Sequence, residues 1–222
     1  MSTRTALVAG ATGLVGGHLA CRLLDARAWN RIVTLGRRPL DLDHPKLEQR
    51  TVDFDRLEDA DLPPADDAFC GLGTTIKKAG SEEAFRRVDY EYVLAFARAA
   101  RQHGAEQFVV VSAMGANARS RIFYNRVKGE MEDAVAAVGF DAVQIVRPAL
   151  LLGDRDEQRP GERIGQMLMQ PVAPLMLGPL RKYRPIEADA VAGAMVAAAQ
   201  LRTPGVHVYE SDELQRISLA SA

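Results

Sequence analysis

Cysteine and histidine are scarce in this chain of 222 residues, and neither sign of charge is in clear excess. The only cysteines, Cys21 and Cys70, form no C-x-x-C pair and no disulfide framework, which fits a reducing compartment. The four histidines are scattered without metal-ligand spacing, so we expect no metal site. The net charge of −1 gives no indication of nucleic acid or an anionic membrane as a partner.

Long apolar runs and a leader segment are also lacking. The apolar stretches are shorter than the roughly 20 residues that cross a bilayer. The N-terminal Met-Ser-Thr-Arg-Thr runs directly into an expected strand and leaves no room for a signal peptide. We therefore expect a soluble, cytoplasmic protein without a membrane segment. Because 47% of the residues are hydrophobic, the chain can bury the core of one domain.

Strand-like and helix-like segments alternate along the chain as far as Gly153. Apolar runs predict six strands, at residues 5–9, 32–35, 50–54, 67–71, 107–112 and 142–146. Helical spacing predicts helices over residues 14–26, 81–104 and 120–138, and an Ala-rich one over 187–201. This alternation predicts an α/β fold of Rossmann type, with a doubly wound parallel sheet.

The alternation stops after Gly153. Residues 154–185 hold five prolines, which argues against long regular elements there. We expect this segment to form a short, lid-like insert that covers the substrate. It is too short to fold alone, so residues 1–222 are expected to form a single NAD(P)-binding domain.

A glycine-rich turn with the spacing G-x-x-G-x-x-G joins the first strand to the first helix. Gly10 would allow the tight turn, Gly13 a close approach to a phosphate, and Gly16 close packing of the helix on the strand. N–H groups of the first helical turn would then face a pyrophosphate. A turn that binds nothing is the alternative. The flanking strand and helix favour a cofactor site that comprises Gly10, Thr12, Gly13, Leu14, Val15 and Gly16.

The end of the second strand distinguishes between the two nicotinamide cofactors. NAD enzymes usually carry an acid here, whereas this chain has Arg37 and Arg38. Guanidinium groups suit a 2′-phosphate, which predicts NADPH; solvated loop arginines are the alternative. Asp53 could accept a hydrogen bond from the adenine amino group or cap the next turn. Small residues after the fourth strand would let the cofactor cross the sheet edge: Gly71, Leu72, Gly73 and Thr74.

A serine and a Tyr-x-x-x-Lys spacing follow downstream. Ser112 ends the fifth strand, where ligands of open parallel sheets bind, and Tyr124 and Lys128 share one helix face. A free tyrosine is a poor base at neutral pH, but a nearby ammonium favours the tyrosinate. Ser112 would donate to the substrate oxygen, Tyr124 would transfer a proton, and Lys128 would also hold the nicotinamide ribose. An ordinary core stripe is the alternative, which the glycine turn disfavours.

Five stretches carry a further signal, at residues 70–75, 87–93, 124–130, 147–148 and 154–162. Together they resemble an atypical member of the short-chain dehydrogenase/reductase superfamily, and more narrowly the Tat-interacting-protein-like oxidoreductase branch. The resemblance covers nearly the whole chain. It implies a Rossmann-type fold with NADPH and assigns the serine, tyrosine and lysine roles to Ser112, Tyr124 and Lys128. We also expect Arg147 at the cofactor. Asp89 departs from the active-site asparagine of many relatives.

The sequence therefore predicts an NADPH-dependent oxidoreductase that reduces a small, apolar carbonyl substrate. The region after Gly153 is too short for the usual sugar domain, which argues against nucleotide-sugar substrates. The alternative is a regulatory protein that binds NADPH, changes its affinity for a protein partner and has little turnover. A nucleotide-fold scaffold that binds no cofactor is a third reading.

Overall fold

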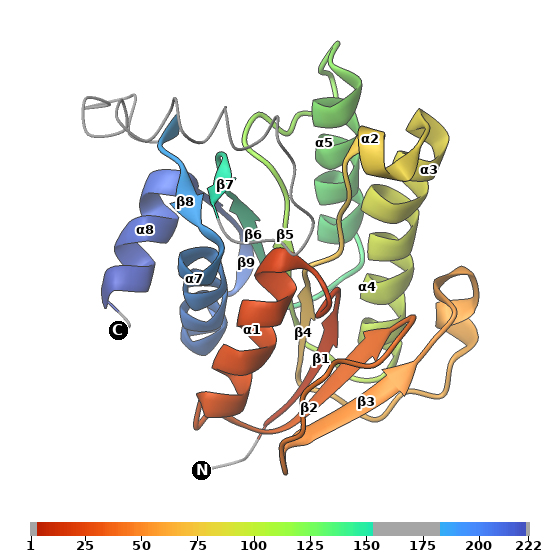
Figure 1. Ribbon diagram of the computed structural model, residues 1–222, viewed down its shortest axis with the longest axis vertical. Coiled ribbons are helices and arrows are strands. Elements are labelled where there is room, and N and C mark those ends of the chain that lie inside the picture. Colours follow the sequence, from red (N-terminus) through yellow and green to blue (C-terminus); the bar gives the residue numbers. More distant parts are fainter. Residues whose placement is uncertain (1–3, 153–182, 221–222) are drawn as a thin grey trace.

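The computed structural model describes residues 4–152 and 183–220, which form helical layers on both sides of a central sheet (Figure 1). Its seven strands are all parallel, in the order β3-β2-β1-β4-β5-β6-β9. They are β1 (Arg4–Ala9), β2 (Trp29–Gly36), β3 (Leu47–Thr51), β4 (Asp67–Cys70), β5 (Gln107–Val111), β6 (Ala142–Arg147) and β9 (Gly205–Glu210). The predicted doubly wound fold is confirmed. The predicted lid at 154–185 lies outside the described residues, except for 183–185.

Helices cover both faces of the sheet (Figure 1). One face carries α1 (Leu14–Asp25), α7 (Ala188–Leu201) and α8 (Ser211–Ala220). The other carries α4 (Tyr92–Gln102) and α5 (Phe123–Ala136), with the short elements α2 (Ile76–Ala79), α3 (Glu82–Arg86), η1 (Phe54–Asp59) and η2 (Arg87–Glu91) nearby. A separate two-stranded ladder pairs β7 (Leu151–Leu152) with β8 (Ile186–Glu187).

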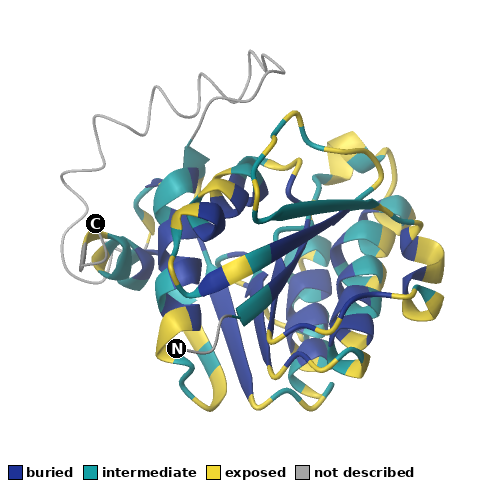
Figure 2. Cartoon of the chain, turned by 90° about the horizontal axis from the view of Figure 1, so that it is seen from below, coloured by how far each residue is buried: buried dark blue, intermediate teal, exposed yellow. Residues whose placement is uncertain are grey.

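The alternation of side chains along the central strands builds two apolar cores. In β1, Ala6 and Val8 join the core under α1 and α7, whereas Leu7 and Ala9 join the core under α4. All four side chains are fully buried, and Figure 2 shows the central strands buried along most of their length. Because both faces are covered, these strands are apolar throughout, which is what made them recognisable in the sequence.

The third strand was predicted too late in the chain. It occupies Leu47–Thr51, not 50–54, because Phe54 already begins the 3₁₀ turn η1. Asp53 caps that turn: its carboxylate accepts a hydrogen bond from the backbone N–H of Asp55 at 3.0 Å. Of the two roles considered for Asp53, the structure therefore shows the cap.

The single helix predicted over residues 81–104 is divided into segments. Ser81 caps its start as expected, because its hydroxyl accepts from the N–H of Ala84 at 3.0 Å. Between α3 and α4, however, the backbone forms the π-helical turn η2. Such turns are rare and often occur at functional sites. This one turns Asp89 into the protein interior, where it is fully buried.

Strand β9 and helix α8 were not predicted. β9 lies at the sheet edge beside β6, and Val206 and Val208 are 50% and 40% exposed there. An edge strand that buries little apolar surface has a weak hydrophobic pattern, so the sequence offered no clear signal for it.

The strand order reverses between β1 and β4, and this reversal places the candidate site. In open parallel sheets, ligands bind at such a point, outside the carboxyl ends of the strands. Here the loops after β1 and β4 come together: a Cβ added to Gly10 would lie 2.4 Å from the carbonyl carbon of Gly71. The backbones of the two loops are therefore in direct contact, which a side chain at position 10 would prevent.

The loop after β5 packs closely on α5, the helix that carries Tyr124 and Lys128. The N–H of Asn117 donates to the carbonyl of Asn125 at 2.9 Å. A Cβ on Gly129 would lie 2.1 Å from the backbone nitrogen of Ala118. Because backbone atoms cannot rotate away, a side chain at position 129 must push the loop off the helix.

Gly129→Ala is expected to lower the free energy of unfolding by about 1–3 kcal/mol, measured by urea denaturation. Gly17→Ala is the matched control, because Gly17 also lies in a helix but its added Cβ would meet only ordinary contact, 3.6 Å from the carbonyl of Ala11. That variant should keep or raise the stability, since alanine favours helices. Equal effects of the two substitutions would contradict the packing argument.

Candidate active site

The glycine turn has the geometry of a phosphate cradle. Gly10 adopts a left-handed φ of +84°, and its carbonyl accepts the N–H of Gly13 at 2.9 Å. A Cβ on Gly16 would lie 2.0 Å from the Gly10 oxygen, so only glycine fits there. Helix α1 has no side-chain cap and no acid in its first turn. No carboxylate therefore competes with an anion for the first N–H groups of the helix. Thr12, Leu14 and Val15, which were predicted at the cofactor, lie at this end of α1.

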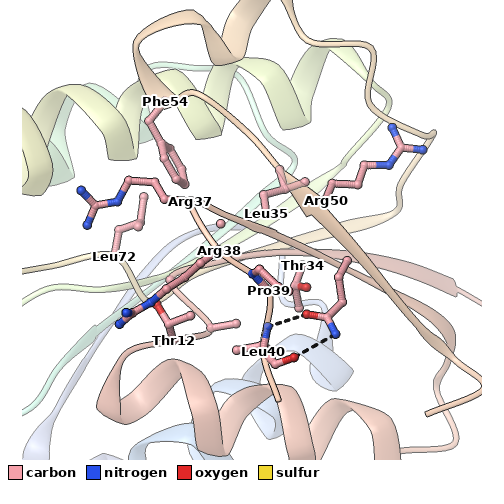
Figure 3. Close-up of a pocket in the computed structure, with 14 residues that line it drawn as sticks. Thr12, Thr34, Leu35, Arg37, Arg38, Pro39, Leu40, Arg50, Phe54 and Leu72 are labelled. Atoms are coloured by element: carbon pink, nitrogen blue, oxygen red, sulfur yellow. Dashed lines mark hydrogen bonds between the residues drawn. The ribbon is translucent and has the colours of Figure 1, made fainter. Parts of the chain in front are cut away.

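A pocket lies beside this turn (Figure 3). It joins the turn to the end of β2 and to the loops after β3 and β4. Its lining residues are Gly10, Ala11, Thr12, Thr34, Leu35, Gly36, Arg37, Arg38, Pro39, Leu40, Gln49, Arg50, Phe54 and Leu72. The structure thus brings together five residues predicted at the cofactor from three separate segments: Gly10, Thr12, Arg37, Arg38 and Leu72.

Arg37 and Arg38 are both exposed, and no hydrogen bond or ion pair of their guanidinium groups occurs within residues 4–152 and 183–220. Figure 3 shows the two side chains extending to the same side of the pocket, past Leu72 and Thr12. Arg50, by contrast, is engaged by Glu48 and by a backbone carbonyl. The two predicted arginines are therefore available for an anion.

Phe54 is a pocket residue that sequence reasoning missed. Its ring is almost fully buried and packs against Tyr92 with 5.4 Å between centroids. With Leu72 it gives the pocket an apolar wall. Asp53, the neighbour that was predicted, does not line this pocket. The sequence predicted a strand through position 54, whereas a 3₁₀ turn begins there and places the Phe54 ring in the pocket wall.

Ser112 directly follows β5 at the carboxyl edge of the sheet. Its N–H donates to the carbonyl of Val146 at 2.8 Å, which fixes its backbone. The Ser112 side chain is buried, and its hydroxyl has no hydrogen-bond partner in the part of the chain that the structure describes. A buried hydroxyl without a partner is costly, and at this sheet edge it has both a donor and acceptor capacity to offer a ligand.

Tyr124 and Lys128 lie one turn apart on α5. The Tyr124 ring is half-buried against Phe85, with 5.3 Å between centroids. Lys128 is buried, and its ammonium is close enough to Tyr124 for an electrostatic interaction. The helix therefore carries the tyrosine and the buried cation on one face, as the spacing predicted.

Asp89 is the partner of Lys128. Its Oδ1 lies 2.7 Å from Lys128 Nζ, and both side chains are almost completely buried. The other oxygen, Oδ2, accepts the N–H of Thr74 at 2.8 Å. A Cβ on Gly73 would lie 3.4 Å from Asp89 Oδ1 and 3.8 Å from Lys128 Nζ. Asp89 thus joins the loop after β4, with its predicted residues Gly71–Thr74, to the helix of Tyr124 and Lys128.

The charge state of Lys128 follows from these contacts. Burial alone would lower the pKa of Lys128, but the Asp89 carboxylate, with smaller contributions from Tyr124 and Cys70, more than offsets it and raises that pKa. Lys128 therefore remains an ammonium at neutral pH. Burial also raises the pKa of the Cys70 thiol to about 12, so this cysteine stays protonated.

Arg147, which was predicted at the cofactor, is paired with Glu132 in the structure. Its guanidinium makes two hydrogen bonds to the Glu132 carboxylate, at 2.9 and 2.5 Å. This pair links the end of β6 to α5, and Arg147 does not line the pocket of Figure 3. A contact between Arg147 and the cofactor stays a prediction.

Residues 4–152 and 183–220 show neither a membrane span nor a metal cluster. Among these, no helix is long and apolar enough to cross a bilayer. No group of three or more His, Cys, Asp or Glu side chains there could hold a metal ion.

The fold and the glycine cradle are those of a nucleotide-binding protein, and the sequence profile of the NAD(P)H-binding family matches residues 10–201. The chain belongs to this family. It is similar to Protein HTATIP2 of Rattus norvegicus, with 37% identity over 169 residues that cover 73% of this chain and 69% of the relative. It is also similar to Protein FMP52, mitochondrial, of Candida albicans, with 34% identity over 201 residues that cover 87% and 86%. The resemblance found in the sequence is confirmed.

Solved structures share the fold. MoeE5 in complex with UDP-glucose and NAD superposes with a TM-score of 0.68 at 19% identity, covering 97% of this chain and 81% of that one. The human epimerase family protein SDR39U1 with NADPH superposes with a TM-score of 0.62 at 20% identity, covering 93% and 74%. At such low identity the likeness extends to the fold alone.

The predicted cytoplasmic location is wrong. Several fungal relatives at 34–36% identity, from Candida albicans, Emericella nidulans and others, are named mitochondrial proteins. The prediction depended on few cysteines and a short N-terminus. A low cysteine count indicates a reducing environment but does not say which compartment provides it.

Proposed function

We propose that this protein is an NADPH-dependent oxidoreductase that reduces a small, apolar carbonyl compound through Ser112, Tyr124 and Lys128. The observation that carries the proposal is the buried, charged Lys128 beside Tyr124, on a helix at the same sheet edge as the NAD(P)H-binding turn. A buried ammonium is costly, so its presence next to a tyrosine favours a chemical role over simple packing.

The residues present fit a bound dinucleotide. The glycine turn lines the pocket through Gly10, Ala11 and Thr12, and the start of α1 carries no acidic side chain that would repel a pyrophosphate. The apolar wall of Phe54 and Leu72 suits an adenine ring. Arg37 and Arg38 lie at the end of β2 and suit a 2′-phosphate, which is why we propose NADPH over NADH.

When bound, NADPH supplies a hydride to the carbonyl carbon. Ser112 donates a hydrogen bond to the carbonyl oxygen and stabilises the charge that develops there. Tyr124 gives its proton to that oxygen, which completes the alcohol. The tyrosinate left behind is stabilised by the Lys128 ammonium until it takes a proton from solvent. The Lys128 ammonium has three N–H donors, so those that do not face Asp89 can donate to a ribose hydroxyl.

The surroundings of Tyr124 support an apolar substrate. Phe85 packs against both Phe123 and Tyr124, with ring centroids 5.9 and 5.3 Å apart. Ile122, which directly precedes α5, is 62% exposed. Phe85 is fully buried and supports the Tyr124 ring, whereas Ile122 presents apolar surface two residues before the proton donor, which would favour an apolar carbonyl over a charged one.

The double variant Arg37→Ala/Arg38→Ala tests the choice of cofactor. Each charge-assisted hydrogen bond to a phosphate contributes about 1.5–3 kcal/mol, so the loss of two is expected to raise the NADPH dissociation constant by about 10²–10⁴. The constant for NADH should stay within about threefold, because NADH has no 2′-phosphate. Both values can be measured by isothermal titration calorimetry.

Arg27→Ala/Arg216→Ala is the matched control, because it removes two exposed arginines that do not line the pocket. It should change neither dissociation constant by more than about threefold, since screened surface charges contribute little. If the Arg37/Arg38 variant lost affinity for both cofactors equally, these arginines would not bind the 2′-phosphate selectively.

A further inference from the structure

Hydrogen bonds to β3 and the residue after it hold the loop of Arg37 and Arg38 on both sides of the two arginines. Before them, the carbonyl of Gly36 accepts the N–H of Val52 at 2.9 Å. After them, the N–H of Leu40 donates to Oε1 of Gln49 at 2.6 Å. Only Arg37, Arg38 and Pro39 lie between these two points of attachment.

Gln49 uses both the oxygen and the nitrogen of its side-chain amide to hydrogen-bond this loop. Its Nε2 donates to the carbonyls of Leu40 and Leu42, at 3.2 and 3.0 Å. Figure 3 shows both hydrogen bonds between Gln49 and Leu40 as dashed lines at the edge of the pocket. Three hydrogen bonds from one side chain hold the loop more firmly than any one would, because they fix both position and direction.

Gln49 is itself well placed to act as an anchor. It lies in β3, in register with Thr34 of β2, and so belongs to the sheet. Leu40 and Leu42 also pack against the apolar core under α1, which holds the loop through a second set of contacts. Pro39 adds stiffness, because its ring fixes its own φ and restricts Arg38 to extended conformations.

A fixed loop matters because the two guanidinium groups repel each other and have no carboxylate partner among the described residues. In a mobile loop they would separate into solvent. Binding a phosphate would then have to order two long side chains and the backbone that carries them. A loop that is ordered beforehand avoids the backbone part of that cost.

We propose that Gln49 is a positioning residue for cofactor selection: it fixes residues 40–42 so that Arg37 and Arg38 face the pocket ready for a 2′-phosphate. The inference rests on the proposed use of NADPH. A neutral side chain, Gln49, would then contribute to the distinction between NADPH and NADH.

Gln49→Met tests the inference, because methionine has nearly the same length but neither donates nor accepts strongly. The NADPH dissociation constant, measured by titration calorimetry, is expected to rise about tenfold, and that of NADH to stay within about twofold. Gln102→Met, at an exposed position that ends α4, is the matched control and should change neither constant.

Pro39→Gly loosens the same loop without altering β3 and should reproduce the selective loss, which keeps the test decisive if Gln49→Met folds poorly. Equal weakening of both cofactors, or no change, in these variants would overturn the role of Gln49. The proposed function is judged separately by Arg37→Ala/Arg38→Ala. If that variant loses its preference for NADPH while Gln49→Met keeps it, only the inference about Gln49 fails.

Discussion

Tyr124→Phe is expected to lower the turnover number for carbonyl reduction by about 10²–10⁴, the usual contribution of a positioned general acid. The substitution removes one hydroxyl and keeps the ring that packs on Phe85. NADPH affinity should therefore change little. Loss of NADPH absorbance, followed with a panel of aldehydes, ketones and quinones, measures the rate, and titration calorimetry measures the affinity.

Tyr92→Phe is the matched control. It also removes a hydroxyl, one that donates to Asp55 at 3.1 Å, and keeps the ring that packs on Phe54. It should leave the turnover number unchanged. A Tyr124→Phe enzyme that keeps most of its rate would remove Tyr124 as the proton donor. Tight NADPH binding without turnover of any panel member would favour the alternative of a cofactor-sensing regulator.

Asp89→Ala is expected to cost about 3–5 kcal/mol of folding free energy, because it leaves the Lys128 ammonium buried without a counter-ion. Lys128 and Asp89 expose only 4% and 1% of their side chains, so water cannot replace the lost partner. Since the pKa of Lys128 is raised, the stabilisation is present at neutral pH and is lost only as the pH rises through that raised value. Urea denaturation at pH 7 measures the cost.

Two further variants separate the buried charge from simple truncation. Glu58→Ala breaks the ion pair with Arg98, whose side chains are 42% and 53% exposed, and should cost under about 1 kcal/mol. Lys128→Met combined with Asp89→Ala removes both buried charges and should be more stable than Asp89→Ala alone. A double variant that is as unstable as the single one would show that the loss arises from packing.

Features that depend on one segment of the chain were predictable from the sequence. β1, Gly10 and the start of α1 follow one another directly, and each has a local signature: an apolar run, a left-handed turn and helical spacing. The same holds for Tyr124 and Lys128, since a spacing of four places two side chains on one helix face whatever the rest of the protein does.

Features that depend on contacts between distant segments were not predictable. Asp89 is 39 residues from Lys128, and only the π-helical turn η2 brings its carboxylate to the ammonium. The sequence showed Asp89 merely as a departure from an asparagine. Gln49 gave no signal either, because its role depends on the backbone of a loop that returns to β3.

We expect NADPH to bind at the carboxyl edge of the sheet, beside the glycine turn and the pocket of Figure 3. The most direct measurement is calorimetric titration of the unmodified protein with NADPH and, separately, with NADH. The account predicts one NADPH per chain, bound at least about tenfold more tightly than NADH because Arg37 and Arg38 contact the 2′-phosphate. Binding of neither cofactor, or a preference for NADH, would contradict it.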